Sequence, residues 1–357
     1  MEINQSFDDI RNILVLRTDG IGDVLNSTPA ISALRKTYPD AHITVVVKPY
    51  GAEMLSQNSD VDEIIIYDPQ SQHKKLMDKV YFLRKLRSNG YDTALVLNNS
   101  SLSNFMAYVS GARIRVGCRS EPKRFNHTLT HWVNRRDPKG TKHEIDRNLD
   151  VVYLLNVKNG TRNLVLRFTE EEKTYAEDFL RLNNLGEERD NGFLFRLVGI
   201  HPGGSSCDKL WPSEYFAEIA DRLIDEFNAR VILFTGPSEK ALAQNILSNV
   251  KHPMTLASGI NLRQLAVLIG RCSLFICNDS GPMHIASALK VPIVAIFGST
   301  DYVRWRPQNE NAVVVRKDMD CWPCSAHKCK RNYECTKTLP VSQVWKAIME
   351  LKSNTFL

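Results

Sequence analysis

Short runs of apolar residues recur along the chain, separated by helical patterns or loops. The first half contains "NILVLR", "HITVVV", "DEIIIY" and "DTALVL", and a second series contains "LVGIHPGG", "ARVILFTG", "SLFICND" and "VPIVAIFG". This alternation is typical of βα units around a parallel sheet. It predicts an α/β protein with two doubly wound halves and a ligand crevice at the carboxyl ends of the strands.

A change of pattern after Gly160 marks the expected boundary between the halves. A helix capped by Thr169, with Glu172 three residues on, is followed by the polar stretch "GEERDNG". A chain of 357 residues usually forms two domains. We therefore predict a first Rossmann-like domain over residues 1–185, a second over 186–340, and a C-terminal helix over 341–357.

Composition limits the class of protein further. No run approaches about 20 apolar residues, and the polar start "MEINQSFDDIRN" is unlike a secretory signal. Four cysteines are scattered singly, as is usual in a reducing compartment: Cys118, Cys207, Cys272 and Cys277. We expect a cytoplasmic protein without a membrane span.

The positive charge is concentrated in one segment. Residues 113–147 hold ten Lys and Arg against four Asp and Glu, which accounts for the whole net charge of +6. The segment is either a solvated face with basic loops or a patch for an anionic partner. No aromatic-interleaved recognition motif accompanies this charge, so we expect no nucleic-acid partner.

Two loops at predicted strand ends have chemistry suited to phosphate. In "GIHPGGSSCDKLWP", Gly203 and Gly204 allow backbone N–H groups to approach a ligand, and Lys209 supplies a cation. In "NDSGPMHIASALK", the stretch from Asp279 to Pro282 opens a helix whose first amides could face an anion. The structural alternatives are a glycine turn with a surface lysine, an N-cap at Asp279 or Ser280, and an interior histidine at His284. Neither loop is a Walker P-loop, and "DGIGD" lacks the full G-x-G-x-x-G spacing.

Four longer stretches together resemble glycosyltransferase family 9: "RTDGIGDVLNSTPAISALRKTYPDAHITVVV", "HEIDRNLDVVYLL", "HPGGSSCDKLWP" and "NDSGPMHIASALKVPIVAIFGSTD". The family comprises heptosyltransferases of the two-Rossmann GT-B architecture, whose two domains face each other across a cleft. They move a heptose from ADP-heptose to the inner core of lipopolysaccharide. The resemblance thus implies an inverting glycosyltransferase with a nucleotide-sugar donor and an anionic glycolipid acceptor. It also implies a location at the inner face of the cytoplasmic membrane.

The resemblance also implies roles for individual residues. Asp23 would be the general base, with Gly20 and Gly22 on the acceptor side, although a carboxylate so near a helix start could also simply cap it. Lys209 would stabilise the departing diphosphate without a catalytic metal. Glu239 would hold the ribose and Asp279 the heptose. The full donor-binding set predicted is Gly203, Gly204, Ser205, Glu239, Asp279, Ser280, Gly281, Pro282, Met283 and His284.

The remaining four cysteines are clustered in "CWPCSAHKCKRNYEC". The spacing of Cys321, Cys324, Cys329 and Cys335 suits a structural zinc or iron site, the alternative being reduced thiols or one local disulfide. Some family 9 relatives that modify autotransporter proteins carry a four-cysteine iron finger, so a protein acceptor remains an alternative. Two other functions also stay open, a sugar-nucleotide epimerase of the same fold and a non-catalytic scaffold.

Overall fold

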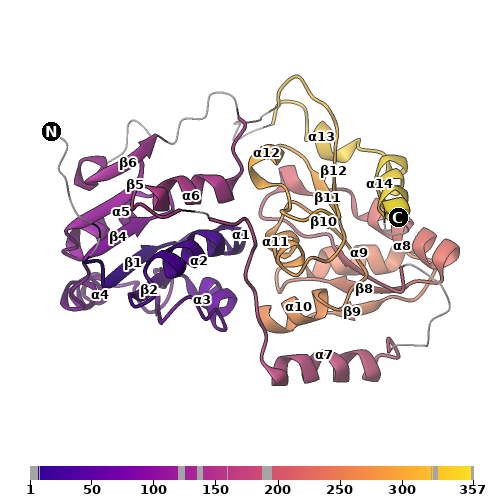
Figure 1. The fold of residues 1–357 in the computed structure, drawn as a ribbon. Coiled ribbons are helices and arrows are strands. Elements are labelled where there is room, and N and C mark those ends of the chain that lie inside the picture. The colour runs from indigo at the N-terminus through magenta and orange to yellow at the C-terminus, as the bar shows by residue number, and fades with distance from the viewer. Residues whose placement is uncertain are drawn as a thin grey trace. The chain divides into compact units, whose positions relative to one another are not determined.

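The computed structural model describes residues 7, 9–119, 125–134, 140–158, 160–186, 195–322, 324 and 329–354. The chain divides by its internal contacts into two compact units, Met1–Arg167 (unit 1) and Phe168–Leu357 (unit 2). Figure 1 shows unit 1 in indigo to magenta and most of unit 2 in orange to yellow. Each unit has a sheet of its own with helices around it.

The sheet of unit 1 is parallel and six-stranded within the described residues. Its strands in spatial order are β3 (Glu63–Ile66), β2 (His42–Val47), β1 (Asn12–Leu16), β4 (Thr93–Val96), β5 (Ile114–Arg119) and β6 (His131–Asn134). In the central strand β1, residues 13–16 are fully buried. Apolar side chains on both faces explain why these strands read as continuous hydrophobic runs.

Helices cover both faces of this sheet. Helix α2 packs with α6 and helix α4 with α5. The helical segments of unit 1 are α1 (Ile21–Leu25), α2 (Thr28–Thr37), α3 (Pro49–Leu55), α4 (Leu76–Ser88), α5 (Ser101–Val109), the 3₁₀ turn η1 (Asn126–Thr128) and α6 (Glu144–Tyr153).

Unit 2 repeats this plan. Its six-stranded parallel sheet has the spatial order β12 (Ala312–Arg316), β11 (Ile293–Phe297), β10 (Leu274–Asn278), β7 (Leu197–His201), β8 (Arg230–Phe234) and β9 (Thr255–Ala257). Its helical segments are α7 (Glu170–Leu182), the 3₁₀ turn η2 (Cys207–Lys209), α8 (Ser213–Phe227), α9 (Lys240–Asn249), α10 (Leu262–Ile269), α11 (Gly281–Ala288), α12 (Tyr302–Trp305), α13 (Glu334–Lys337) and α14 (Val341–Asn354).

Both sheets have the strand order of a Rossmann fold. In unit 1 the first and fourth strands, β1 and β4, are neighbours, and in unit 2 the corresponding strands are β7 and β10. Successive strands are added toward one edge of the sheet before this point and toward the other edge after it. Folds of this kind bind ligands in the crevice at the carboxyl ends of the two strands where the order switches. The predicted fold class, two Rossmann-like α/β halves, is confirmed.

The division of the chain falls earlier than the predicted boundary at residue 185. Thr169 and Glu172 do form a capping box at the start of α7. However, the Glu172 carboxylate also accepts two hydrogen bonds of 2.7 Å from Arg263 of α10. The tertiary contact places α7 in unit 2, and the C-terminal helix α14 likewise contributes to the core of that unit.

The described residues of the basic segment 113–147 include strands as well as loops. The segment contains β5 and β6, and Arg115 is used internally, donating to the carbonyls of Thr128 and Ala112 at 2.6 Å each. Five of its basic residues lie outside the described residues: Lys123, Arg124, Arg135, Arg136 and Lys139. In the described part of the chain, no helix is long and apolar enough to cross a membrane.

Candidate functional site

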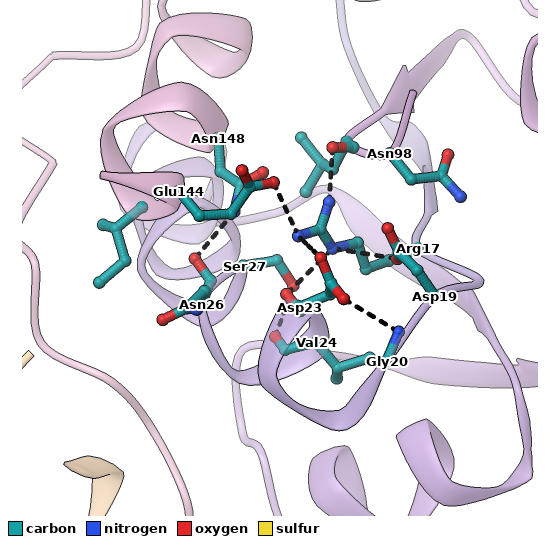
Figure 2. A network of polar contacts seen from close by, with 12 residues as sticks. Arg17, Asp19, Gly20, Asp23, Val24, Asn26, Ser27, Asn98, Glu144 and Asn148 are labelled. Atoms are coloured by element: carbon teal, nitrogen blue, oxygen red, sulfur yellow. Dashed lines mark hydrogen bonds and ion pairs between the residues drawn. The ribbon is translucent and has the colours of Figure 1, made fainter. Parts of the chain in front are cut away.

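A fully buried arginine stands at the carboxyl end of β1. Arg17 donates through one terminal nitrogen to the carbonyl of Leu97, directly after β4, at 2.6 Å, and through Nε to the carbonyl of Asp23 in α1 at 2.9 Å. Figure 2 shows the guanidinium at the centre of a polar network. The residue therefore ties together β1, β4 and α1 at the point where a Rossmann fold binds its ligand.

Three carboxylates surround this guanidinium. The distances from Arg17 nitrogens to carboxylate oxygens are 3.3 Å for Asp19, 3.2 Å for Asp23 and 3.2 Å for Glu144. Burial alone would lower the pKa of Arg17, but the three carboxylates outweigh it and the pKa is raised. Burial raises the pKa of Asp19 despite the neighbouring arginine. Arg17 therefore remains positively charged among three acidic side chains.

Asp23 makes the capping contact that its position allowed. Its Oδ2 accepts a hydrogen bond from the Gly20 amide at 3.1 Å, while Oδ1 faces Arg17. A β-carbon on Gly20 would lie 3.0 Å from Oδ2, so the glycine permits this close approach, and Gly22 is buried in α1. About 22% of the Asp23 side chain remains exposed. The carboxylate is therefore fixed in orientation, while part of the side chain remains exposed to solvent.

In unit 2, Asn278 links the ends of the two central strands. This buried residue at the end of β10 donates from Nδ2 to the carbonyl of Pro202, after β7, at 2.6 Å. Its Oδ1 accepts from the Trp211 amide at 3.3 Å, and the Trp211 indole donates to the carbonyl of Leu339 at 2.9 Å. Both ends of the loop that carries the two glycines and Lys209 are anchored in this way.

Lys209 and Asp279, which sequence reasoning placed in one site, are in direct contact. The Lys209 Nζ lies 2.6 Å from Asp279 Oδ2. Asp279 immediately precedes Ser280, the N-cap residue of α11, and the Ser280 side chain makes no capping hydrogen bond. The first turn of α11, with Gly281 and Met283, therefore keeps amide donors without a side-chain cap. Ser280 therefore occupies the N-cap position, as one alternative expected, but its side chain caps no amide, and anion binding at this turn stays a prediction.

Glu239 lies over the glycine-rich loop. Its Oε2 accepts from the Gly236 amide at 2.7 Å and lies 3.6 Å from Nε2 of the buried His201. A β-carbon on Gly203 would stand 1.8 Å from Glu239 Oε1, whereas one on Gly204 would meet nothing closer than 3.2 Å. Burial lowers the pKa of His201, although Glu239 opposes the shift. Any side chain at position 203 would therefore have to displace the Glu239 carboxylate.

The other predicted donor residues differ in accessibility. Ser205 is exposed in the loop, whereas Pro282 and Met283 are buried in the first turn of α11. His284 is also buried, and its ring packs edge-on against Trp305 at 6.2 Å between centroids. This contact supports the alternative of an interior histidine.

The four clustered cysteines line one cavity, together with Asp208, Gly298, Ser299, Lys317, Met319, Trp322 and Tyr333. All four thiols are free, so the local disulfide is not formed. Burial and the neighbouring Cys329 raise the pKa of Cys335. Among the described residues, no three candidate ligands converge as a metal site requires. The shared cavity suits a four-thiolate site by ligand type, but the positions of the thiols do not by themselves define one.

This cavity adjoins one of the predicted donor loops. Asp208, next to Lys209, lines it and hydrogen-bonds to Ser299. The Cys324 amide donates to the carbonyl of Ser299 at 3.3 Å. Ser299 therefore links the cysteine segment to the loop that carries the predicted catalytic lysine.

Two Rossmann-like units, each with charged groups at its central strand ends, define a protein of the two-domain GT-B class. The model of glycosyltransferase family 9 (heptosyltransferase) matches residues 80–334, and the chain belongs to this family. It is a glycosyltransferase.

Individual relatives match over almost the whole length. Lipopolysaccharide heptosyltransferase 3 of Escherichia coli strain K12 is 28% identical, over 92% of this chain and 95% of its own. The crystal structure of a family 9 glycosyl transferase from Veillonella parvula matches at 26% identity and a TM-score of 0.83, covering 98% of each chain. The structure of ADP-heptose lps heptosyltransferase II from Escherichia coli matches in fold, at 24% identity and a TM-score of 0.74, covering 97% of this chain and 100% of its own.

Reasoning from the sequence missed several residues of the site, among them Arg17, Asp19, Glu144 and Asn278. Arg17 and Asn278 each end a buried apolar run, and a polar residue in that position was the available signal. Glu144 gave no such signal, since its partner Arg17 lies 127 residues away in the sequence.

Proposed function

We propose that this protein is an inverting glycosyltransferase that moves a heptose from ADP-heptose to an anionic acceptor in the inner core of lipopolysaccharide. The observation that carries the proposal is the Lys209–Asp279 pair, 2.6 Å apart, beside the N-terminus of α11. This is a preorganised site for a charged leaving group. The name of the 28%-identical lipopolysaccharide heptosyltransferase supports the sugar and the acceptor class, and the resemblance to family 9 supports ADP.

The unit 2 loops supply electrostatic stabilisation in this reaction. The acceptor hydroxyl attacks the anomeric carbon, and the bond from that carbon to the diphosphate oxygen breaks with its electron pair on the diphosphate. Lys209 and the amides of Gly281 and Met283 stabilise the charge that develops there. By the resemblance to family 9, Asp279 contacts the sugar and Glu239 contacts the ribose. A single displacement inverts the anomeric configuration.

Asp23 takes the proton of the attacking hydroxyl. One positioned base suffices, because a nucleoside diphosphate leaves without being protonated. Arg17 and the Gly20 amide fix the carboxylate through separate oxygens. Arg17 is therefore a positioning residue. Neither the base nor the leaving-group site calls for a catalytic metal.

Cations at the carboxyl edge of the unit 1 sheet favour an anionic acceptor. Lys48 follows β2, and Arg119 ends β5, with its guanidinium 3.4 Å from the ring centroid of the half-exposed Trp132. Such groups suit the phosphates or acidic sugars of a glycolipid. We place the protein at the inner face of the cytoplasmic membrane.

We further propose that Cys321, Cys324, Cys329 and Cys335 hold a structural zinc or iron ion. Their common cavity and the affinity of thiolates for these metals support this site. When bound, the metal would cross-link the segment whose Cys324 amide donates to Ser299, the residue that also hydrogen-bonds to Asp208. Elemental analysis should give about one zinc or iron per chain; four titratable thiols without metal, and unchanged stability in Cys324→Ser, would rule the site out.

A thermal-shift screen with a panel of nucleotide sugars tests the donor assignment. A ligand at 100 times its Kd stabilises the native state by about 2.7 kcal/mol, so ADP-heptose should raise the melting temperature above all other donors. Turnover of the donor without any acceptor would instead indicate an epimerase. If the protein transfers the sugar to a protein substrate but not to lipopolysaccharide core, the acceptor that we propose is wrong and a protein takes its place.

A further inference from the structure

Helix α4 exposes large apolar side chains on its outer side. The exposed fractions are 75% for Leu76, 56% for Met77 and 61% for Tyr81. The same helix is attached to the unit 1 core by the buried Phe82 and Leu86. The outer face of a helix packed in this way is normally polar. Three large apolar residues within its first two turns are therefore unusual.

Lysines adjoin these residues. Lys74 and Lys75 are both exposed and directly precede the helix. In the described part of the chain, neither lysine forms an ion pair with a carboxylate. We call Lys74, Lys75, Leu76, Met77 and Tyr81 the α4 surface. Exposed apolar side chains beside unpaired lysines are the combination that binds an anionic lipid surface.

The start of α4 lies at the same edge of the sheet as Asp23. Tyr67 directly follows β3, and its ring stacks on that of His73 at 5.3 Å between centroids. The Asp68 amide donates to Nδ1 of His73 at 3.0 Å. This compact turn keeps Lys74 and Lys75 at the carboxyl end of β3. That strand lies two positions from β1 in the sheet, or about 10 Å at the usual strand spacing.

We propose that the α4 surface docks unit 1 on an anionic lipid bilayer. Leu76 and Met77 insert at the level of the headgroups, while Lys74 and Lys75 pair with lipid phosphates. The charge of the lysines favours lipid over a second copy of this chain, because identical basic surfaces repel each other. The inference rests on the proposed function in one respect, since it would bring the Asp23 edge of the sheet to the membrane that holds a glycolipid acceptor.

Flotation of the full-length chain with vesicles tests the docking directly. The vesicles contain either phosphatidylcholine alone or an equal mixture with phosphatidylglycerol, and no donor or acceptor is present. We expect binding to the anionic vesicles that weakens with added salt. Leu76→Ser/Met77→Ser and Lys74→Gln/Lys75→Gln should each weaken it at least tenfold. The control for the apolar variant is Leu182→Ser, since this leucine of α7 is also 75% exposed. The control for the lysine variant is Lys251→Gln/Lys346→Gln, which changes two exposed lysines of unit 2. Both should bind like the unchanged chain.

Three results would overturn the inference. The unchanged chain could fail to bind anionic vesicles, or the controls could lose as much binding as the α4 variants. Sedimentation velocity could also show a dimer that Leu76→Ser/Met77→Ser dissociates, in which case a second copy covers the surface. Transfer to a detergent-dispersed acceptor, measured separately, should be unchanged in that variant. A chain that binds vesicles but transfers no sugar would refute the proposed function and leave the docking intact.

Discussion

Replacing Arg17 with Met tests how the acidic cluster of unit 1 is held. Methionine keeps much of the length of the side chain but removes its charge. Glu144, whose side chain is 1% exposed, would then be buried without its cation, and Asp19 and Asp23, 34% and 22% exposed, would face each other across the lost guanidinium. Removing one partner of a buried ion pair costs about 3–5 kcal/mol. For a unit of this size that corresponds to a fall of roughly 6–20 °C in melting temperature.

Calorimetry of Arg17→Met and of Arg17→Met/Glu144→Gln measures this cost. The double variant replaces the buried carboxylate with a neutral amide, so it should recover most of the lost stability. A single variant that melts within about 2 °C of the unchanged protein, or a double variant no more stable than the single, would refute the reasoning.

Three further predictions concern unit 2. Lys209→Ala should lower kcat by the equivalent of about 2–4 kcal/mol, as for other oxyanion-stabilising donors; a rise in KM with kcat intact would make Lys209 a ground-state binder instead. Gly203→Ala should displace the Glu239 carboxylate, since the new methyl would stand 1.8 Å from Oε1, and should weaken ADP binding by calorimetry, whereas unchanged affinity would separate Glu239 from the donor site. Burial lowers the pKa of His201 in the native state. The unfolded chain therefore takes up a proton at His201 near pH 6.5, whereas the native state does not. The unfolding free energy should accordingly fall as the pH drops below about 6.5. Urea titrations should show this slope reduced in His201→Asn, and an equal slope in both proteins would contradict it.

The architecture was predictable because the central strands are buried on both faces. Eight apolar runs read from the sequence became β1 to β4, β7, β8, β10 and β11. The shorter β9 and the strands β5, β6 and β12 were missed. β5 and β6 lie in the basic segment, where arginines such as Arg115 interrupt the apolar pattern. The charged residues there were interpreted as lying on the surface. The Arg115 side chain instead donates hydrogen bonds to backbone carbonyls of neighbouring turns.

The candidate site was predictable where one short loop contains the chemistry. Asp23 and its contact to Gly20 lie within four residues, and the Lys209 and Asp279 loops each follow a predicted strand. Contacts between distant segments were not predictable. The capping box at Thr169 was read correctly, but its Glu172 also binds Arg263, and this decides which unit the helix joins. The link through Ser299 between the cysteine segment and the Lys209 loop was missed for the same reason.

Transfer of radiolabelled heptose from ADP-heptose to a lipopolysaccharide core acceptor, by the unchanged protein and by Asp23→Asn, tests the central claim most directly. Asparagine keeps the size of the side chain and an oxygen able to accept from the Gly20 amide, but it is not a base. The unchanged protein should form a product of inverted anomeric configuration, and Asp23→Asn should form it roughly 10²- to 10⁴-fold more slowly with nearly unchanged donor affinity. Transfer by Asp23→Asn within a few-fold of the unchanged protein, or no acceptor-dependent transfer by either, would contradict the account.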